Sequence, residues 1–99
     1  MKNFLIETTD IAPINKEEEW LPRHMEYLKL GYDRGILLCC GPKVPRSGGI
    51  IIARADSYAE IDEFLANDPF FINQITTYRI IEFNPVNKIP LMNEWFDGK

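Results

Sequence analysis

Short apolar runs alternate with amphipathic stretches along the chain, and this pattern predicts four strands separated by two helices. The second and third apolar runs are hydrophobic at every position, which is typical of strands that are covered on both faces. A connection rich in glycine and proline joins these two runs and predicts a hairpin. The predicted strands are residues 3–9, 36–40, 50–53 and 74–83.

The first amphipathic stretch follows the first strand and contains a proline, Pro22. Proline fits the first turn of a helix and not its interior, so the firm part of this helix is predicted to begin at residues 20–22. Gly35 follows the last apolar position and predicts that the helix ends near Asp33. Residues 10–16 are predicted to form a loop.

The second amphipathic stretch begins with a capping signal. Ser57 and Glu60 have the Ser-x-x-Glu spacing in which two side chains satisfy free amide groups at a helix start. Asp68 and Pro69 end this stretch, because the residue before a proline disfavours the helical conformation. The stripe predicted to be buried consists of Tyr58, Ile61, Phe64 and Leu65.

The order strand, helix, strand, strand, helix, strand predicts the ferredoxin-like α+β fold (βαββαβ), with two helices on one face of an antiparallel sheet. The other face would be left bare although the middle strands are apolar on both sides. Since monomers rarely expose a large apolar patch, we predict a homodimer with its two sheets packed together. Residues 1–86 form the predicted domain. Residues 87–99 form a tail too apolar to be free, and we expect it to dock on the domain or on the partner.

The composition of the chain argues against several classes of function but does not point to a particular one. The 99 residues suffice for one domain, and the net charge of −4 argues against nucleic acid, which needs a basic surface. No apolar run approaches the ~20 residues of a membrane span, and no signal peptide is evident, so we expect a cytoplasmic protein. Cys39 and Cys40 are adjacent, which disfavours a disulfide or a zinc site and favours two small buried side chains. No metal or cofactor is predicted.

The candidate chemistry rests on His24, the only histidine, and on Asp68. His24 shares the apolar face of the first helix with Leu21 and Leu28, at spacings of three and four residues. The two helices of this fold run antiparallel, so the start of the first lies near the end of the second. We therefore predict that His24 and Asp68 make contact, directly or through one water, and that the pair can act as an acid and a base.

Each of these residues also has a purely structural explanation. His24 could be a core histidine whose nitrogens are satisfied by a neighbour. Asp68 could be the N-cap of a following turn with Pro69 at its first position. The two roles of Asp68 are compatible, because a capping carboxylate has a second oxygen to offer. Three cations flank the hairpin and could bind an anionic substrate: Lys43, Arg46 and Arg54. The simpler explanation is that they are solvated charges on the surface.

Four short motifs occur in order: Arg23 to Leu28, Gly35 to Leu38 followed by Cys40-Gly41-Pro42, Gly48 to Ile50, and Asn67 to Phe70. In these motifs the chain resembles the YciI-like proteins of the dimeric α/β-barrel group, over roughly residues 3–86. The resemblance implies a pocket in which a histidine and the aspartate of an Asp-Pro-Phe motif form an acid/base pair. His24 and Asp68 match those two positions.

Two classes of function follow. The resemblance implies a small-molecule enzyme of the isomerase or lyase type, acting on a small cyclic or aromatic metabolite, with His24 as general acid or base oriented by Asp68. The alternative is a non-catalytic domain that binds a small molecule or a partner. In either case we expect a homodimer or a higher homo-oligomer. The other residues expected to line the pocket are Arg23 at its mouth, Gly41, Pro42 and Phe70.

Overall fold

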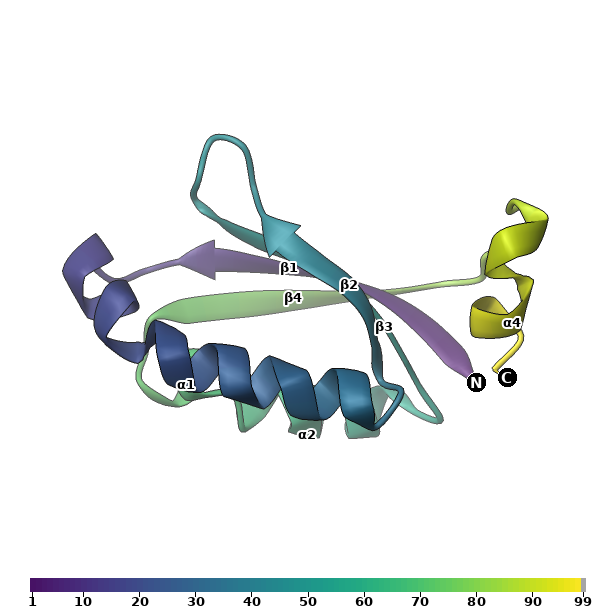
Figure 1. Cartoon of the computed structure of the whole chain (residues 1–99), viewed down its shortest axis with the longest axis horizontal. Helices are drawn as coiled ribbons and strands as arrows, with labels where there is room; N and C mark the ends of the chain where they lie inside the picture. The colour runs from purple at the N-terminus through teal and green to yellow at the C-terminus, as the bar shows by residue number, and fades with distance from the viewer. Residues whose placement is uncertain (99) are drawn as a thin grey trace.

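The computed structural model describes residues 1–98 and places its four strands in one antiparallel sheet (Figure 1). The spatial order of the strands is β2-β3-β1-β4, with β1 and β3 in the middle. The strand bounds are β1 Lys2–Asp10, β2 Leu37–Pro42, β3 Gly48–Ala55 and β4 Thr76–Phe83.

The helices follow the predicted order, with one long helix after β1 and a helix pair after β3. Together with the strand order, this is the expected ferredoxin-like arrangement. A short tail of helical turns follows β4. The bounds are α1 Ile14–Asp33, α2 Tyr58–Ala66, α3 Pro69–Ile72, the 3-10 turn η1 Pro90–Met92 and α4 Asn93–Phe96.

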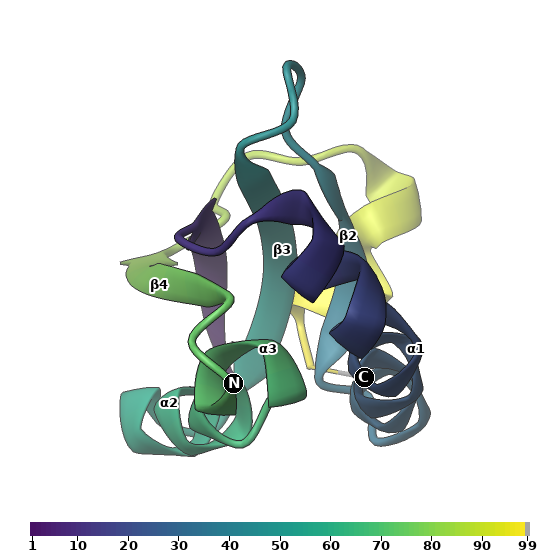
Figure 2. The same cartoon turned by 90° about the vertical axis from the view of Figure 1, so that its left-hand side faces the viewer.

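The hydrophobic core lies between the sheet and the two long helices, which cover the same face of the sheet (Figure 2). Phe4 pairs with Ala53 across the two central strands, and Ile6 pairs with Ile51. All four side chains are buried, because alternate residues of a strand point to the same face. The helices complete the core with Leu28, Ile61, Phe64 and Leu65.

The two long helices are joined by one aromatic contact. The Tyr27 hydroxyl donates a hydrogen bond to the Phe64 carbonyl oxygen at 2.6 Å, and the two rings stack with centroids 4.8 Å apart. Gly31 allows this close approach, since a Cβ atom there would lie 2.6 Å from the Phe64 ring. This contact connects α1 to α2 on the side of α1 that also carries Leu28.

The start of α1 differs from the prediction. The helix begins at Ile14 rather than at residues 20–22, and it continues through Pro22. Pro13 is the N-cap residue, and its carbonyl oxygen accepts the Glu17 amide at 3.2 Å. A proline inside a helix removes one backbone hydrogen bond and bends the helix, and Figure 1 shows that the first part of α1 lies at an angle to the rest. This first part carries Glu17, whose side chain is buried.

Two side chains predicted to be buried, Tyr58 and Cys39, are exposed, and so is one apolar side chain of the tail. Tyr58 is 50% exposed, because it lies in the first turn of α2 at the rim of the core. Cys39 is exposed because it pairs with Ile52 on the sheet face without helices, so the expectation of two buried cysteines is wrong. Leu91 in the tail is 83% exposed. The other predicted members of the α2 stripe are buried, and the predicted Ser57 cap accepts the Glu60 amide at 3.1 Å.

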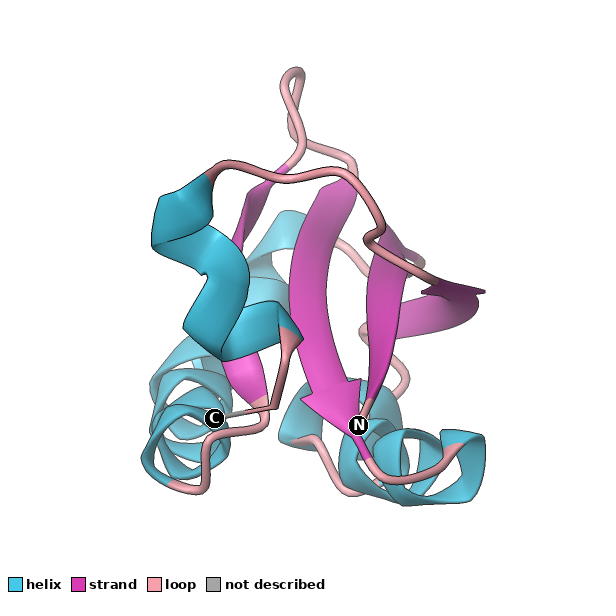
Figure 3. Ribbon diagram, turned by 90° about the vertical axis from the view of Figure 1, so that its right-hand side faces the viewer, coloured by secondary structure: helices cyan, strands magenta, loops and turns pink. Residues whose placement is uncertain are grey.

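The tail lies at the end of the molecule where the N-terminus also lies (Figures 1 and 3). Arg54 of β3 donates a hydrogen bond to the Trp95 carbonyl oxygen at 2.7 Å, and its guanidinium lies 3.8 Å from the centre of the Trp95 ring. Phe83 of β4 meets Phe96 edge to face. These contacts connect the tail to the sheet of its own chain. Docking on a partner stays a prediction.

Candidate functional site

Asp68 is fixed by the start of α3. It is the N-cap residue of this helix, with Pro69 at the first helical position, and its Oδ1 accepts the Phe70 amide at 2.9 Å. Aspartate is a preferred N-cap because its oxygen satisfies an amide that has no partner inside the helix. The predicted structural role of Asp68 is therefore present, and it places a carboxylate that is only 7% exposed at the end of α2.

His24 lies on α1 directly opposite this carboxylate. Its Nδ1 is 2.8 Å from Asp68 Oδ1, so the predicted contact between the two residues is present and direct. The imidazole also stacks on the Phe70 ring, with centroids 3.8 Å apart and planes inclined by 2°. One hydrogen bond and one ring face therefore fix both the position and the plane of the imidazole.

Both hydrogen bonds of Asp68 converge on one oxygen. Oδ1 accepts the Phe70 amide and also faces His24 Nδ1, whereas the sequence analysis assigned the two bonds to different oxygens. A carboxylate is an acceptor, so His24 Nδ1 carries the proton. In the neutral ring Nε2 is then the acceptor, and it makes no hydrogen bond to another residue among 1–98. Nε2 is the atom left free to take or give a proton.

These two side chains line a cavity of about 390 Å³ between α1, α3 and the hairpin of β2 and β3. This volume is within the range of small-molecule sites. Gly41, Pro42 and Phe70 line it, but Arg23 does not. The Arg23 guanidinium lies 4.9 Å from the centre of the Trp20 ring, because adjacent residues of a helix point in different directions.

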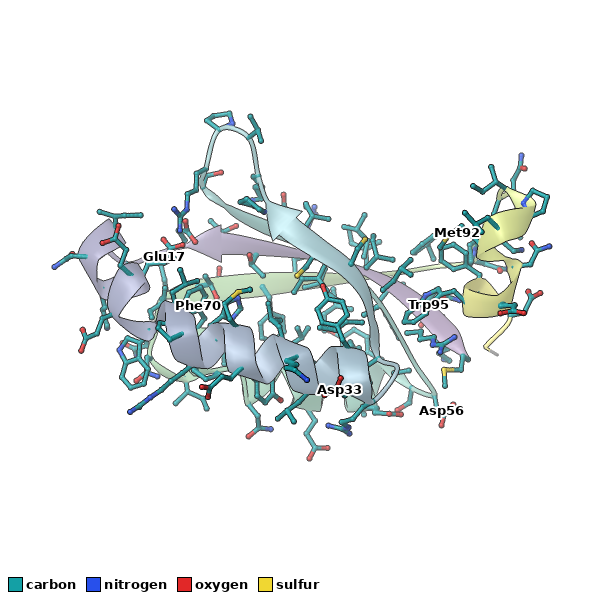
Figure 4. The ribbon with its side chains drawn as sticks, in the orientation of Figure 1. Glu17, Asp33, Asp56, Phe70, Met92 and Trp95 are labelled. Carbon is teal, nitrogen blue, oxygen red and sulfur yellow. The ribbon has the colours of Figure 1, made fainter. Side chains whose placement is uncertain are left out.

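Two carboxylates that the sequence did not indicate, Asp10 and Glu17, line the same cavity beside Arg46, one of the candidate cations. Arg46 Nη2 lies 2.7 Å from Glu17 Oε1, and the Glu17 side chain is buried while that of Arg46 is half exposed. The Asp10 amide donates to the Ser47 carbonyl oxygen at 3.0 Å, which holds the hairpin against the end of β1. Glu17 and Phe70 lie at the same end of the molecule, away from the tail (Figure 4). Glu17 belongs to a run of three glutamates before Trp20, and this run lies inside α1 because the helix begins at Ile14.

Asp10 has no cation within ion-pair distance among residues 1–98, although Glu17 beside it is paired. Burial raises the pKa of the Asp10 carboxyl above its ordinary value of 3.8, and the nearby charge of Glu17 raises it further. Arg46 and Lys43 lower the pKa of Asp10, but by less. The folded protein therefore binds a proton at Asp10 more tightly than the unfolded chain does.

Asp10→Asn is expected to stabilise the protein near neutral pH. A carboxyl whose pKa rises on folding contributes its full stability only below the unfolded pKa, here about 3.8, and loses it as the pH rises through the raised value. The asparagine variant has no such loss. Thermal unfolding of both proteins between pH 3 and pH 7 should show a gap in favour of the variant that opens as the pH rises. The expectation would be wrong if the stability of the variant relative to the wild type were lower at pH 7 than at pH 3.

A thiol also lines the cavity. Cys40 is partly buried there, and its Sγ lies 3.1 Å from the Tyr32 hydroxyl. Burial and this contact with Cys40 raise the pKa of Tyr32 to about 12, so Tyr32 is an uncharged phenol at neutral pH. The hydrogen bond of Cys40 therefore goes to a phenol and not to His24, and the described residues contain no cysteine–histidine pair of the kind that activates a nucleophile.

Among residues 1–98, no three side chains of the His, Cys, Asp or Glu type are grouped so that they could hold a metal ion. In the same part of the chain, no helix has the length and apolar character that crossing a membrane requires.

The fold and the site together define a small α+β domain whose cavity contains a hydrogen-bonded histidine and aspartate. The chain belongs to the family described as the YCII-related domain, whose model matches residues 1–84. No protein with a curated description matches the chain.

One similar solved structure is the 5-chloro-2-hydroxyhydroquinone dehydrochlorinase TftG from Burkholderia phenoliruptrix AC1100, in complex with 2,5-dihydroxybenzoquinone. The two chains are 21% identical, and the match has a TM-score of 0.72. It covers 82% of this chain and 92% of the other. This similarity confirms the ferredoxin-like fold.

Proposed function

We propose that the protein is a small-molecule enzyme of the isomerase or lyase type, in which His24 and Asp68 transfer a proton to or from a small cyclic or aromatic substrate. The observation that carries the proposal is the 2.8 Å hydrogen bond between His24 Nδ1 and Asp68 Oδ1 in the wall of a cavity. A histidine placed to satisfy the core alone would not need an open cavity at its second nitrogen.

The geometry supports a simple division of roles. Asp68 holds the proton on His24 Nδ1 and stabilises the positive charge that the ring gains when Nε2 accepts a second proton. Phe70 keeps the ring plane fixed through the stacking contact. Nε2 then returns its proton to another atom of the substrate or to water. A positioned acid/base group of this kind typically accelerates a reaction ~10²–10⁴-fold.

The lining of the cavity suits a ring-shaped substrate. Aliphatic and aromatic side chains form much of it, including Leu21, Leu28 and Phe70. TftG, as its name says, removes hydrogen chloride from a hydroxylated ring, and its structure contains a quinone. Such an elimination needs a group that takes a proton from the substrate. TftG therefore gives the proposal one concrete reaction to test, on a protein with the same fold.

Turnover of hydroxylated rings should depend on His24. We expect a panel that includes 5-chloro-2-hydroxyhydroquinone, followed by chloride release and ring absorbance, to contain a substrate whose kcat/KM falls ~10²–10⁴-fold in His24→Ala. The matched control is Arg23→Ala, which alters the same helix outside the cavity.

Two results would oppose the proposal. Equal turnover by wild type and His24→Ala would exclude the imidazole as the proton-transfer group. Tight binding of ring compounds by the wild type with no turnover would favour the alternative, a non-catalytic small-molecule-binding domain. Mass spectrometry of any molecule retained by the purified protein would identify the ligand class in either case.

We also propose that the protein is a homodimer. The sheet face without helices carries Leu5, Ile52, Ile81 and Phe83, and the last two are exposed large apolar side chains. Near the tail, the Asn3 Oδ1 and Trp95 Nε1 atoms are buried, and neither has a hydrogen-bond partner among residues 1–98. A second copy on this face would cover the apolar side chains. The cytoplasmic location stays a prediction from the sequence.

Light scattering at micromolar concentration should give about twice the chain mass of 11.5 kDa. Ile81→Lys should shift the mass toward the monomer, because it places a charge within the exposed apolar face, on the edge strand β4. A wild-type protein that stays at the monomer mass would exclude the sheet-to-sheet dimer.

A further inference from the structure

The carboxylate, guanidinium and imidazole groups in the cavity wall fall into two pairs with one remaining. His24 pairs with Asp68, and Arg46 pairs with Glu17. Asp10 is the remaining group, and no cation lies within ion-pair distance of it among residues 1–98. A ligand that enters the cavity therefore meets a carboxyl group beside Glu17 that makes no direct ion pair among residues 1–98, although Arg46 and Lys43 act on its charge from a distance.

Asp10 is held in place by the backbone on both sides. Its amide donates to the Ser47 carbonyl oxygen, and its strand pairs with β4 at Thr76, which also lines the cavity. On the same strand face, the Thr8 hydroxyl accepts the Gly49 amide at 2.8 Å. These contacts fix the backbone at the end of β1, from which the Asp10 side chain reaches the cavity wall.

Arg46 is not available to balance a second anion. Its guanidinium is held by Glu17, and the Glu17 side chain is buried, so moving Arg46 toward a ligand would leave a buried carboxylate without its partner. Lys43, the next cation along the hairpin, lies 3.3 Å from Glu7. The two nearest cations are therefore already paired.

We propose that Asp10 determines substrate specificity by accepting a hydrogen bond from a substrate hydroxyl and by repelling carboxylates. The inference rests on the proposed function of the cavity, and it narrows the substrate class to small uncharged rings with at least two oxygen substituents. One hydroxyl faces His24 Nε2 and the other faces Asp10. A hydroxyl can donate to a carboxylate, whereas a ligand carboxylate can only oppose it.

Calorimetry with a matched ligand pair tests this inference without any need for turnover. Hydroquinone and 2,5-dihydroxybenzoate share one ring and its two hydroxyl groups, and only the second carries a carboxylate. At pH 7 the wild type should bind hydroquinone at least tenfold more tightly. Asp10→Asn should weaken hydroquinone binding and strengthen dihydroxybenzoate binding, so that the ratio of the two affinities falls about tenfold.

Glu82→Gln is the matched control. Glu82 lies on β4, makes a long ion pair with exposed Lys2 and does not line the cavity, so this variant changes the net charge equally and should keep the wild-type ratio. An equal fall of the ratio in both variants would indicate a long-range charge effect and would overturn the role of Asp10.

Two further results would also overturn the inference. One is a ratio of the two ligand affinities that stays unchanged in Asp10→Asn. The other is a wild type that does not prefer hydroquinone, which includes a wild type that binds neither ligand. A different result would contradict the proposed function and leave the inference about Asp10 intact. If His24→Ala leaves turnover unchanged while the affinity ratio still depends on Asp10, the cavity selects uncharged rings but does not use His24 for chemistry.

Discussion

Replacing Asp68 by alanine should lower both the stability and the turnover of the protein, whereas replacing it by asparagine should lower the turnover alone. Alanine removes the N-cap of α3, at a cost of about 1 kcal/mol. It also leaves the partly buried His24 Nδ1–H group without its acceptor, which adds about 1–3 kcal/mol. Both losses follow from the single oxygen that makes the two bonds.

Asparagine keeps an oxygen at the same place and is as good an N-cap as aspartate. It removes the negative charge that stabilises the protonated imidazole, so kcat/KM should fall on the order of 10²–10⁴-fold while unfolding by urea changes little. Measuring urea unfolding and turnover for both variants separates the role of Asp68 as the N-cap of α3 from its role as the partner of His24. A fully active asparagine variant would show that the charge of Asp68 has no part in the chemistry.

Gly48→Ala should be the most destabilising single-methyl change in the cavity wall. Gly48 has a φ of +145°, and a Cβ atom there would lie 2.0 Å from the Thr8 carbonyl oxygen. The backbone of β1 or β3 would have to move, so we expect a loss of roughly 3 kcal/mol or more from strain and overpacking together. Because β1 ends at Asp10, the same movement should also weaken ligand binding.

Gly41→Ala is the matched control for this prediction. Gly41 lines the same cavity, but a Cβ atom there would meet nothing within 4 Å. This variant should unfold within about 0.5 kcal/mol of the wild type, as surface changes usually do. Chemical denaturation of both variants measures the difference, and a Gly48→Ala protein as stable as Gly41→Ala would show that β1 and β3 tolerate separation at their ends.

Much of this fold follows from local rules of sequence. The order of elements, the Ser57 cap and the end of α2 at Asp68 were all predictable, because each depends on residues close together in the chain. The start of α1 was not. Pro22 follows the usual rule for a first helical turn, but here the helix continues on both sides of the proline, and the ion pair of Glu17 with Arg46 connects its first part to the hairpin.

The candidate site divides in the same way. His24 and Asp68 are brought together by the antiparallel helices of a known arrangement, so topology alone predicted their contact. The pair formed by Glu17 and Arg46 depends on how the hairpin bends over the first turns of α1, which no local pattern specifies. Asp10 could not be predicted for the same reason. Its role depends on the ion pairs that Arg46 and Lys43 make with other carboxylates, and these pairs form only in the folded protein.

The shared oxygen of Asp68 has one further consequence, for measurement. The Phe70 amide and His24 Nδ1 bind the same atom, so the amide stays protected from hydrogen exchange only while α3 is folded around that atom. Any opening that frees the Phe70 amide also removes the acceptor that orients the imidazole. The exchange rate of this one backbone proton therefore reports how often the histidine loses its partner, in the resting protein and without a substrate.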